Sequence, residues 1–254
     1  MRIGWFFTAG AGALVLGATL VHGGPPVAYR VVPLVPGGEL RRDAFSDAQL
    51  GILEKINRTD RQQLFRGKVL VVPETWSADE LDYSPLTARY DTAAAIPKIV
   101  VLYLPAQMFG AYEYGTLVRW GPVSSGRRVS QTPPGLFHLN WRSTGHRSTV
   151  DPEWFLRWYF NFENREGRAL HEYSLPGYPA SHGCVRLLER DARWLFEWGE
   201  PWTLDARDRV VTPGTPLLII GAYDFGAPPP WLSTVWLARP VALPAHDLRA
   251  AGVD

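Results

Sequence analysis

The sequence contains a single cysteine, Cys184, within the polar segment Ser181-His182-Gly183-Cys184-Val185-Arg186. Cysteine attacks as its thiolate, and a free thiol with a pKa of about 8.5 is mostly protonated at neutral pH, so a nucleophilic cysteine needs a base or a cation beside it. A cysteine that only fills space in a core normally has apolar neighbours. The surroundings of Cys184 therefore predict a catalytic nucleophile rather than a packing residue.

Two histidines stand just upstream of this thiol. His182 is two residues away and points to the same side as Cys184 in an extended chain. His171 precedes a loop with Pro176-Gly177 and Pro179, and this loop can fold back to bring the imidazole against the sulfur, as an activated nucleophile requires. Sequence spacing does not decide which histidine is the base.

Two further residues beside the thiol suit acyl transfer. Gly183 leaves the backbone uncrowded, and its amide and that of Cys184 are candidate donors to an oxyanion. Arg186 lies on the same side as the thiol and offers a planar fork for a substrate carboxylate. This short segment thus predicts a nucleophile, an oxyanion site and a carboxylate-binding residue.

The composition indicates a globular protein with one sizeable domain and a small one. The chain has 254 residues, of which 46% are hydrophobic and 20% charged, and its net charge is +1. So small a net charge argues against nucleic acid as a partner, and a single cysteine excludes an intrachain disulfide. Arg2 and the uncharged, mostly apolar stretch 3–21 predict a signal peptide or membrane anchor over residues 1–22, cleaved or retained, and an exported protein.

Residues 28–74 have the pattern of a small α+β module. The stretches 29–32 and 69–72 are strand candidates, and apolar residues at helical spacing predict a helix over 47–57. The segment resembles LysM, a glycan-binding module of envelope enzymes, and Gly37-Gly38-Glu39 replaces the usual Gly-Asp-Thr, so glycan binding and a spacer role both stay open. The matching residues are Tyr29, Val31, Leu53, Asn57, Leu64, Gly67, Leu70, Val71 and Pro73. Residues 75–94 have the pattern of a linker.

From Lys98 onward the pattern is mainly β. The stretches 99–104, 108–114 and 117–124 are separated by short turns, as in a meander. A helical stripe of Leu188, Ala192, Leu195 and Trp198 predicts a helix over 188–200. Residues 209–211 and 216–220 predict a closing hairpin. We expect a mainly β domain with one or two helices over 95–222, and we assign no fold to the Pro-rich tail 223–254.

A histidine, a short loop and then [Ser/Thr]-His-Gly-Cys-hydrophobic-Arg resemble the signature of YkuD-type L,D-transpeptidases. Here the match runs from Leu170-His171 through the loop at Pro176 to Leu187, and supporting matches lie at Ser125-Gly126, Thr132-Pro133-Pro134-Gly135, the aromatic run 158–162 and Gly214-Thr215-Pro216. The resemblance covers residues 95–222 and implies a β-sandwich or barrel-like catalytic domain. Glu172 departs from the family, which often has glycine there and uses the backbone carbonyl of that position to orient the imidazole.

The resemblance also implies a reaction. Cys184 would attack the carbonyl of the third residue of a peptidoglycan stem tetrapeptide, release D-alanine and pass the acyl group to an amine, either another stem's side chain or a lysine of an envelope lipoprotein. It implies that His171 is the base, that His182 and Ser181 shape the site, and that Arg186 and Tyr178 bind substrate. It further implies a periplasmic or cell-envelope role in cell-wall biogenesis and cell shape, without a metal or an organic cofactor.

Alternative interpretations use the same residues. In a sortase the cysteine follows threonine rather than His-Gly, and papain-like hydrolases place the cysteine before the histidine. A zinc site formed by His171, His182 and Cys184 lacks the usual paired-ligand spacing. An L,D-carboxypeptidase that uses water, and a non-catalytic peptidoglycan-binding envelope protein, remain open.

Overall fold

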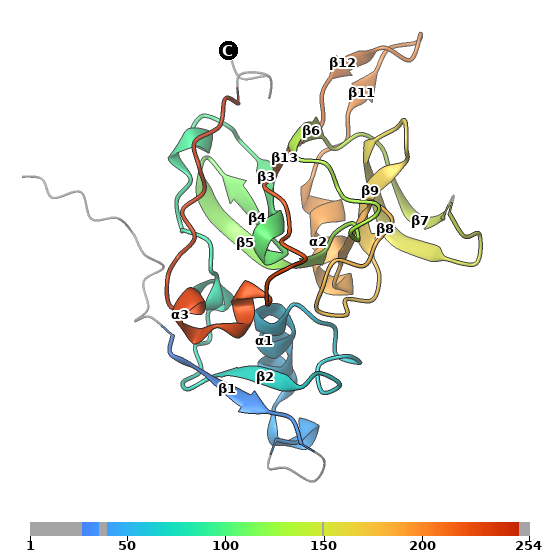
Figure 1. Ribbon diagram of the computed structural model, residues 1–254. Coiled ribbons are helices and arrows are strands. Elements are labelled where there is room, and N and C mark those ends of the chain that lie inside the picture. The colour runs from blue at the N-terminus through green and yellow to red at the C-terminus, as the bar shows by residue number, and fades with distance from the viewer. Residues whose placement is uncertain (1–26, 36–39, 149, 249–254) are drawn as a thin grey trace, which may run out of the picture.

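The computed structural model describes residues 27–35, 40–148 and 150–248 (Figure 1). The predicted export segment 1–22 and Gly37-Gly38-Glu39 lie outside the described residues. Within the described ranges, no helix is both long enough and apolar enough to span a membrane.

One curled sheet dominates the molecule, in the order β6-β13-β3-β4-β5-β10-β9-β8-β7 (Figure 1). Its strands are β3 (Ile99–Tyr103), β4 (Met108–Glu113), β5 (Thr116–Ser124), β6 (Gly135–His138), β7 (Arg142–Arg147), β8 (Phe155–Glu163), β9 (Arg168–Glu172), β10 (Val185–Leu187) and β13 (Pro216–Ile220). β13 runs parallel to β3 and β10 runs parallel to β9, whereas the other neighbours are antiparallel. The predicted mainly β fold class and the strands of the opening meander are confirmed.

The predicted closing hairpin was wrong. β12 (Val210–Thr212) pairs with β11 (Thr203–Leu204), while β13 inserts between β3 and β6. The apolar residues of β13 are buried on both faces, so this strand is stabilised inside the large sheet rather than beside an exposed neighbour.

Alternation along β3 divides the interior into two cores. Ile99 and Val101 pack into one hydrophobic cluster and Val100 and Leu102 into another, so this strand is covered on both faces. The second cluster is closed by α2 (Glu189–Trp198), which buries Ala192 and Leu195 against the sheet. The predicted helix over 188–200 is thereby confirmed.

The N-terminal module pairs β1 (Tyr29–Pro33) antiparallel to β2 (Val69–Pro73), with α1 (Asp47–Asn57) between them. Ser46 and Gln49 form a capping box that begins α1, and Arg58 ends it in the left-handed conformation with φ 58°. One α-helix, preceded by a short 3-10 turn at Arg42–Ala44 and followed by turns, connects the two strands. The resemblance to LysM stays a prediction.

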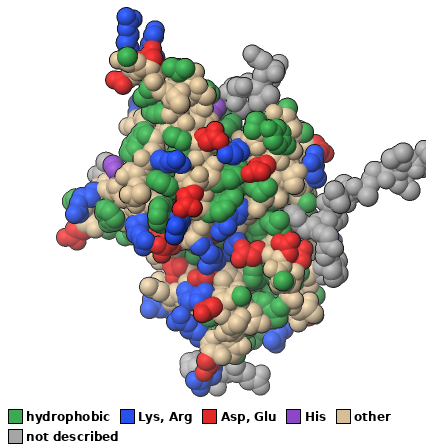
Figure 2. Space-filling model, turned by 180° about the vertical axis from the view of Figure 1, so that it is seen from behind, with side chains coloured by type: hydrophobic (Ala, Val, Ile, Leu, Met, Phe, Trp, Pro, Cys, Tyr) green, Lys and Arg blue, Asp and Glu red, His purple; other side chains and the backbone are tan. Residues whose placement is uncertain are grey.

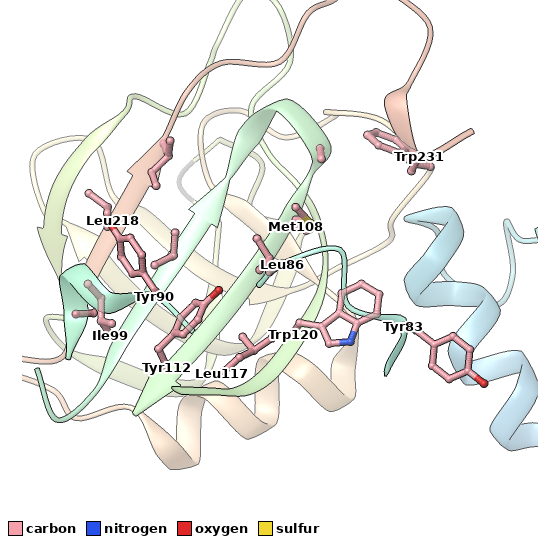
Figure 3. Close-up of a cluster of buried hydrophobic side chains, with 14 of the residues drawn as sticks. Tyr83, Leu86, Tyr90, Ile99, Met108, Tyr112, Leu117, Trp120, Leu218 and Trp231 are labelled. Atoms are coloured by element: carbon pink, nitrogen blue, oxygen red, sulfur yellow. The ribbon is translucent and has the colours of Figure 1, made fainter. Parts of the chain in front are cut away.

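The segment predicted to be a linker packs into the first core. Tyr83, Leu86 and Tyr90 from this segment are at most 3% exposed, in and around the short 3-10 turns at Glu80–Tyr83 and Asp91–Ala93. The tail adds Trp231 from the turn at Pro230–Leu232 and Leu237 from α3 (Thr234–Leu237). Figure 3 shows Tyr83, Trp120 and Trp231 gathered beside α1. These segments are irregular, so their buried residues do not recur with the period of a helix or a strand. Their burial therefore cannot be predicted from sequence periodicity.

Ion pairs join the module to α2 and α2 to the sheet. Arg190 of α2 contacts Glu54 of α1 at 2.6 Å, and Arg119 of β5 contacts the buried Asp191 at 2.7 Å. On the side of the molecule seen in Figure 2, acidic and basic side chains are interspersed over the surface. This distribution agrees with the small net charge of the chain.

Candidate active site

The parallel pair β9–β10 brings the predicted nucleophile and base together. Arg186 lies opposite His171 in the register of the two strands, and Cys184 immediately precedes β10. β10 is a short strand held between β5 and β9 near the middle of the sheet. The loop 173–184 therefore returns the chain to the strand that carries His171, as its prolines and glycine predicted.

A cavity of about 290 Å³ opens at this point. Five of the predicted site residues line it together: His171, Ser181, His182, Cys184 and Arg186. We call it the Cys184 pocket. Gly183 and Tyr178 are not among the lining residues. Tyr178 is 56% exposed, and its carbonyl accepts a hydrogen bond from the Ser124 hydroxyl at 2.7 Å.

The Cys184 thiol lies against the start of β9. Its Sγ is 3.7 Å from the Gly167 carbonyl oxygen. Burial raises the pKa of the Cys184 thiol, while a backbone hydrogen bond from Ala169 and the charges of Arg168 and Arg186 act in the opposite direction. The protonated thiol is therefore favoured in the resting site, and deprotonation has to accompany the attack.

His171 is held in one orientation and kept neutral. The residue is 3% exposed, and its Nδ1 lies 2.9 Å from the carbonyl oxygen of Glu172. A carbonyl can only accept, so Nδ1 carries the proton and the other nitrogen, Nε2, is left as the acceptor. Burial lowers the pKa of His171 to about 4, so the imidazole is neutral at physiological pH. The replacement of glycine by Glu172 leaves this backbone contact in place.

The loop that carries the thiol is fixed by hydroxyl groups. Ser181 Oγ donates to the Cys184 carbonyl at 2.5 Å and accepts from the Gly183 amide at 3.1 Å. Thr132 Oγ1 donates to the Gly183 carbonyl at 3.0 Å. Gly183 has φ 112°, a backbone conformation that other residues rarely adopt. Of the two amides predicted as oxyanion donors, that of Gly183 is thus already engaged by Ser181.

His182 and Arg186 line the pocket with aromatic partners. The His182 ring lies 5.4 Å from Trp154, its Nδ1 is buried without a hydrogen bond, and its pKa is lowered by desolvation. The Arg186 guanidinium stacks over Tyr173 at 4.7 Å and donates to the Ser174 carbonyl at 3.4 Å. Within the described residues no carboxylate pairs with Arg186, so its charge is available to a ligand.

A wall of aromatic residues was missed by sequence reasoning. Tyr159 of β8 lies between two histidines, with its ring 4.4 Å from His146 and 6.5 Å from His171, and all three line the pocket. A bulge at Trp158, which has φ 53°, turns Tyr159 toward the pocket while Trp158 itself packs on α2. His146 is distant in sequence, and only the pairing of β7, β8 and β9 brings it close.

No group of three or more His, Cys, Asp or Glu residues in the described part of the chain is arranged to hold a metal ion.

Part of this chain is similar to known proteins. The model of the YkuD L,D-transpeptidase catalytic domain family matches residues 97–219. No curated protein matches the sequence. Among solved structures, an L,D-transpeptidase (Yku) from Stackebrandtia nassauensis is 25% identical, with a TM-score of 0.41, over 50% of this chain and 57% of that one.

Two further structures show a similar level of likeness. LD transpeptidase LdtMt1 in complex with imipenem is 21% identical, with a TM-score of 0.40, over 49% of this chain and 59% of that one. Mycobacterium tuberculosis L,D-transpeptidase 1 is 22% identical, with a TM-score of 0.37, over 49% of this chain and 62% of that one. The match thus spans about three fifths of each of these structures.

Proposed function

Because residues 97–219 belong to the YkuD family of L,D-transpeptidase catalytic domains, we propose that this protein is a cysteine acyltransferase that acts on peptidoglycan stem peptides. One observation carries the proposal. Cys184, immediately before β10, and His171, which lies opposite Arg186 in β9, line one pocket together with Arg186. A thiol, an oriented neutral imidazole and an unpaired guanidinium are the groups that acyl transfer from a carboxylate-bearing peptide requires.

In the first step the Cys184 sulfur attacks the carbonyl carbon of the third residue of a stem tetrapeptide. His171 Nε2 takes the thiol proton as the carbon–sulfur bond forms, since the imidazole is neutral and its Nδ1 is engaged by Glu172. The carbon–nitrogen bond to D-alanine then breaks, and the proton passes from His171 to the departing amine. A thioester on Cys184 remains.

In the second step an amine attacks the thioester, the carbon–sulfur bond breaks, and the thiol recovers its proton. The acceptor is the side-chain amine of another stem or a lysine of an envelope lipoprotein. Arg186 binds a substrate carboxylate, because its guanidinium faces the pocket with only a carbonyl and an aromatic ring as partners. His182 and Ser181 shape the site, and the exposed Tyr178 contacts a part of the substrate that extends beyond the pocket.

This chemistry belongs to the cell envelope, and the export pattern of residues 1–22 agrees with such a location. The N-terminal module would then hold the catalytic domain beside its substrate, either as a spacer or by binding glycan.

The proposal is tested by mixing the purified protein with a tetrapeptide muropeptide and measuring the intact mass. We expect an adduct on Cys184 equal to the donor minus D-alanine, and its transfer to an added amine. An adduct that only water removes would indicate an L,D-carboxypeptidase. No adduct and no product, on a folded protein whose thiol reacts with iodoacetamide, would contradict the proposal and leave the non-catalytic interpretation.

A further inference from the structure

Arg168, at the start of β9, is a cation of the Cys184 pocket that the mechanism above does not use. Its side chain is 20% exposed and is held by two carboxylates: one η nitrogen contacts Glu163 at 3.2 Å, and the other contacts Glu166 at 2.6 Å. Both ends of the guanidinium fork are therefore fixed. The remaining donor, Nε–H, makes no hydrogen bond within the described residues.

The free edge of this guanidinium faces the peptide that carries the nucleophile. A Cβ atom added to Gly183 would lie 3.3 Å from Arg168 Nε and 3.8 Å from its Cδ. The absence of a side chain at Gly183, together with its φ of 112°, lets the Arg168 side chain pack directly on the backbone that precedes Cys184. Glycine at position 183 thus allows both the turn of the backbone and the close packing of the Arg168 side chain on it.

The thiol itself lies beside the backbone of Arg168. Its sulfur contacts the Gly167 carbonyl at 3.7 Å, and the Ala169 backbone also bonds to the Cys184 thiol. The two backbone contacts of the sulfur thus flank Arg168 in the chain. Both carboxylates contact the η nitrogens, whereas Nε, which lies beside Gly183, contacts neither, and the charge of Arg168 acts to lower the pKa of the Cys184 thiol.

The site needs such a cation. In many cysteine enzymes an imidazolium stabilises the thiolate. His171 is buried and neutral here, and it therefore contributes no positive charge before it accepts the proton. Arg186, the other guanidinium of the pocket, is engaged with the Tyr173 ring and the Ser174 carbonyl and serves the substrate in the proposed function. Arg168 remains as a fixed positive charge beside the sulfur.

We propose that Arg168, clamped by Glu163 and Glu166, stabilises the negative charge that develops on Cys184 and on the tetrahedral intermediate during acyl transfer. The part concerning the intermediate rests on the proposed function, whereas the part concerning the thiolate does not. Glu166 opposes Arg168 electrostatically, because its carboxylate partly cancels the field of the guanidinium at the sulfur.

The test measures the rate of Cys184 alkylation by iodoacetamide against pH, in wild type, Arg168→Gln, Arg168→Lys and Glu166→Gln. A single cysteine makes the reading unambiguous. Other titratable and charged groups line the pocket or contact Arg168 and are unchanged in all four proteins. They are His146 of β7, Tyr159 and Glu163 of β8, His171 of β9, Arg186 of β10, and His182 and Tyr173 of the adjoining loop.

We expect Arg168→Gln to move the alkylation midpoint to higher pH and to lower the thiolate fraction at pH 7 by about 3-fold to 10-fold. Arg168→Lys should recover most of this loss, because it keeps the charge. Glu166→Gln should move the midpoint to lower pH. Its side chain is 60% exposed, so this variant is expected to fold even if Arg168→Gln does not.

Arg168→Gln and Glu166→Gln distinguish an electrostatic role of the cluster from a purely structural one. If the cluster only holds the loop in shape, Arg168→Gln and Glu166→Gln will shift the midpoint in the same direction or not at all, and either result would overturn the proposal. Donor acylation, measured on the same proteins by intact mass, should fall with the thiolate fraction. If even the wild type fails to acylate while the two midpoints shift in opposite directions, the proposed function fails but the role of Arg168 at the thiol stands.

Discussion

Two regions of this molecule bury ionisable side chains, and they treat them in opposite ways. At the junction between α1 and the sheet, Arg58 is 0% exposed. Its guanidinium donates to the carbonyls of Ala106, Lys55 and Ile56 and lies 5.6 Å from both the Trp120 and the Trp231 rings. Burial lowers the pKa of Arg58 to about 9, which still leaves it charged at neutral pH.

In the Cys184 pocket the two histidines keep a ring nitrogen without a hydrogen bond. His171 makes one backbone hydrogen bond, and the buried Nδ1 of His182 makes none. Both regions hold a non-glycine residue in the left-handed conformation, Trp158 with φ 53° beside the pocket and Arg58 with φ 58° at the junction, so backbone strain does not distinguish them. The comparison indicates that the junction contributes stability, whereas the pocket keeps proton acceptors free for chemistry.

The largest effect should come from the nucleophile. Cys184→Ala removes the sulfur and leaves the rest of the residue in place. The sulfur makes no hydrogen bond to a side chain, so the fold should be retained. We expect turnover to fall by at least about 10⁴-fold. Product formation from a tetrapeptide donor and the thermal midpoint would be measured together. Retention of more than about 1% of the activity would contradict the assignment of Cys184.

The base should come next. His171→Gln keeps a donor for the Glu172 carbonyl but removes the proton acceptor, so we expect acylation to slow by about 10²-fold to 10⁴-fold. His182→Gln is the matched control in the same pocket and should have a smaller effect. Rapid-mixing mass spectrometry of the acyl-enzyme gives both rates. The opposite ranking would transfer the role of base to His182.

At the junction the effect should fall on stability instead. Arg58→Met removes the side-chain donor of three carbonyls, and we expect the free energy of unfolding to fall by about 3 kcal/mol. The control is Arg41→Met, because the Arg41 side chain is 75% exposed beside Asp43, and its loss should cost less than about 1 kcal/mol. Urea unfolding followed by fluorescence measures both. A strong loss of acylation in folded Arg58→Met would show that the two regions are coupled.

The sequence predicted the pocket better than the junction, for a physical reason. His182, Cys184 and Arg186 stand two residues apart in the chain, and His171 stands one loop away, so local spacing was enough to gather them. The meander and α2 could also be predicted from the sequence, because their apolar residues follow the period of a strand or a helix. Arg168 and His146 gave no such signal, since their contacts depend on side-chain reach and on long-range strand pairing.

The junction depends on contacts that no local pattern encodes. In the sequence, nothing distinguishes Arg58 from any other polar residue that follows a helix. In the structure it is enclosed by residues from β4, β5 and the tail. Residues 75–94 were predicted to be a linker, because their buried aromatic residues lie on turns and show no helical or strand period. Burial of an irregular segment is decided by the rest of the fold, so sequence periodicity could not predict it.

The smallest expected effect concerns acid stability and also separates the two regions. The pKa of His171 is about 4 in the folded protein because the ring is buried, against about 6.5 for an exposed histidine. Above pH 6.5 the imidazole is neutral in both the folded and the unfolded state and gives no pH dependence. As the pH falls from 6.5 toward 4, the unfolded state binds the proton first, so folding stability is lost in this window. Wild type should therefore lose about 2 kcal/mol relative to His171→Gln between pH 7 and pH 5.

The same measurement has a control at the surface and a clear contrary outcome. Urea unfolding of wild type, His171→Gln and His246→Gln at pH 7 and pH 5 gives the two differences, and His246→Gln should alter the pH dependence less, because the ring of His246 lies outside the core. The other buried groups are common to all three proteins and cancel in the comparison. If the difference between wild type and His171→Gln is the same at both pH values, burial does not lower the pKa of His171, and below about pH 6.5 a protonated His171 would share the role that we propose for Arg168.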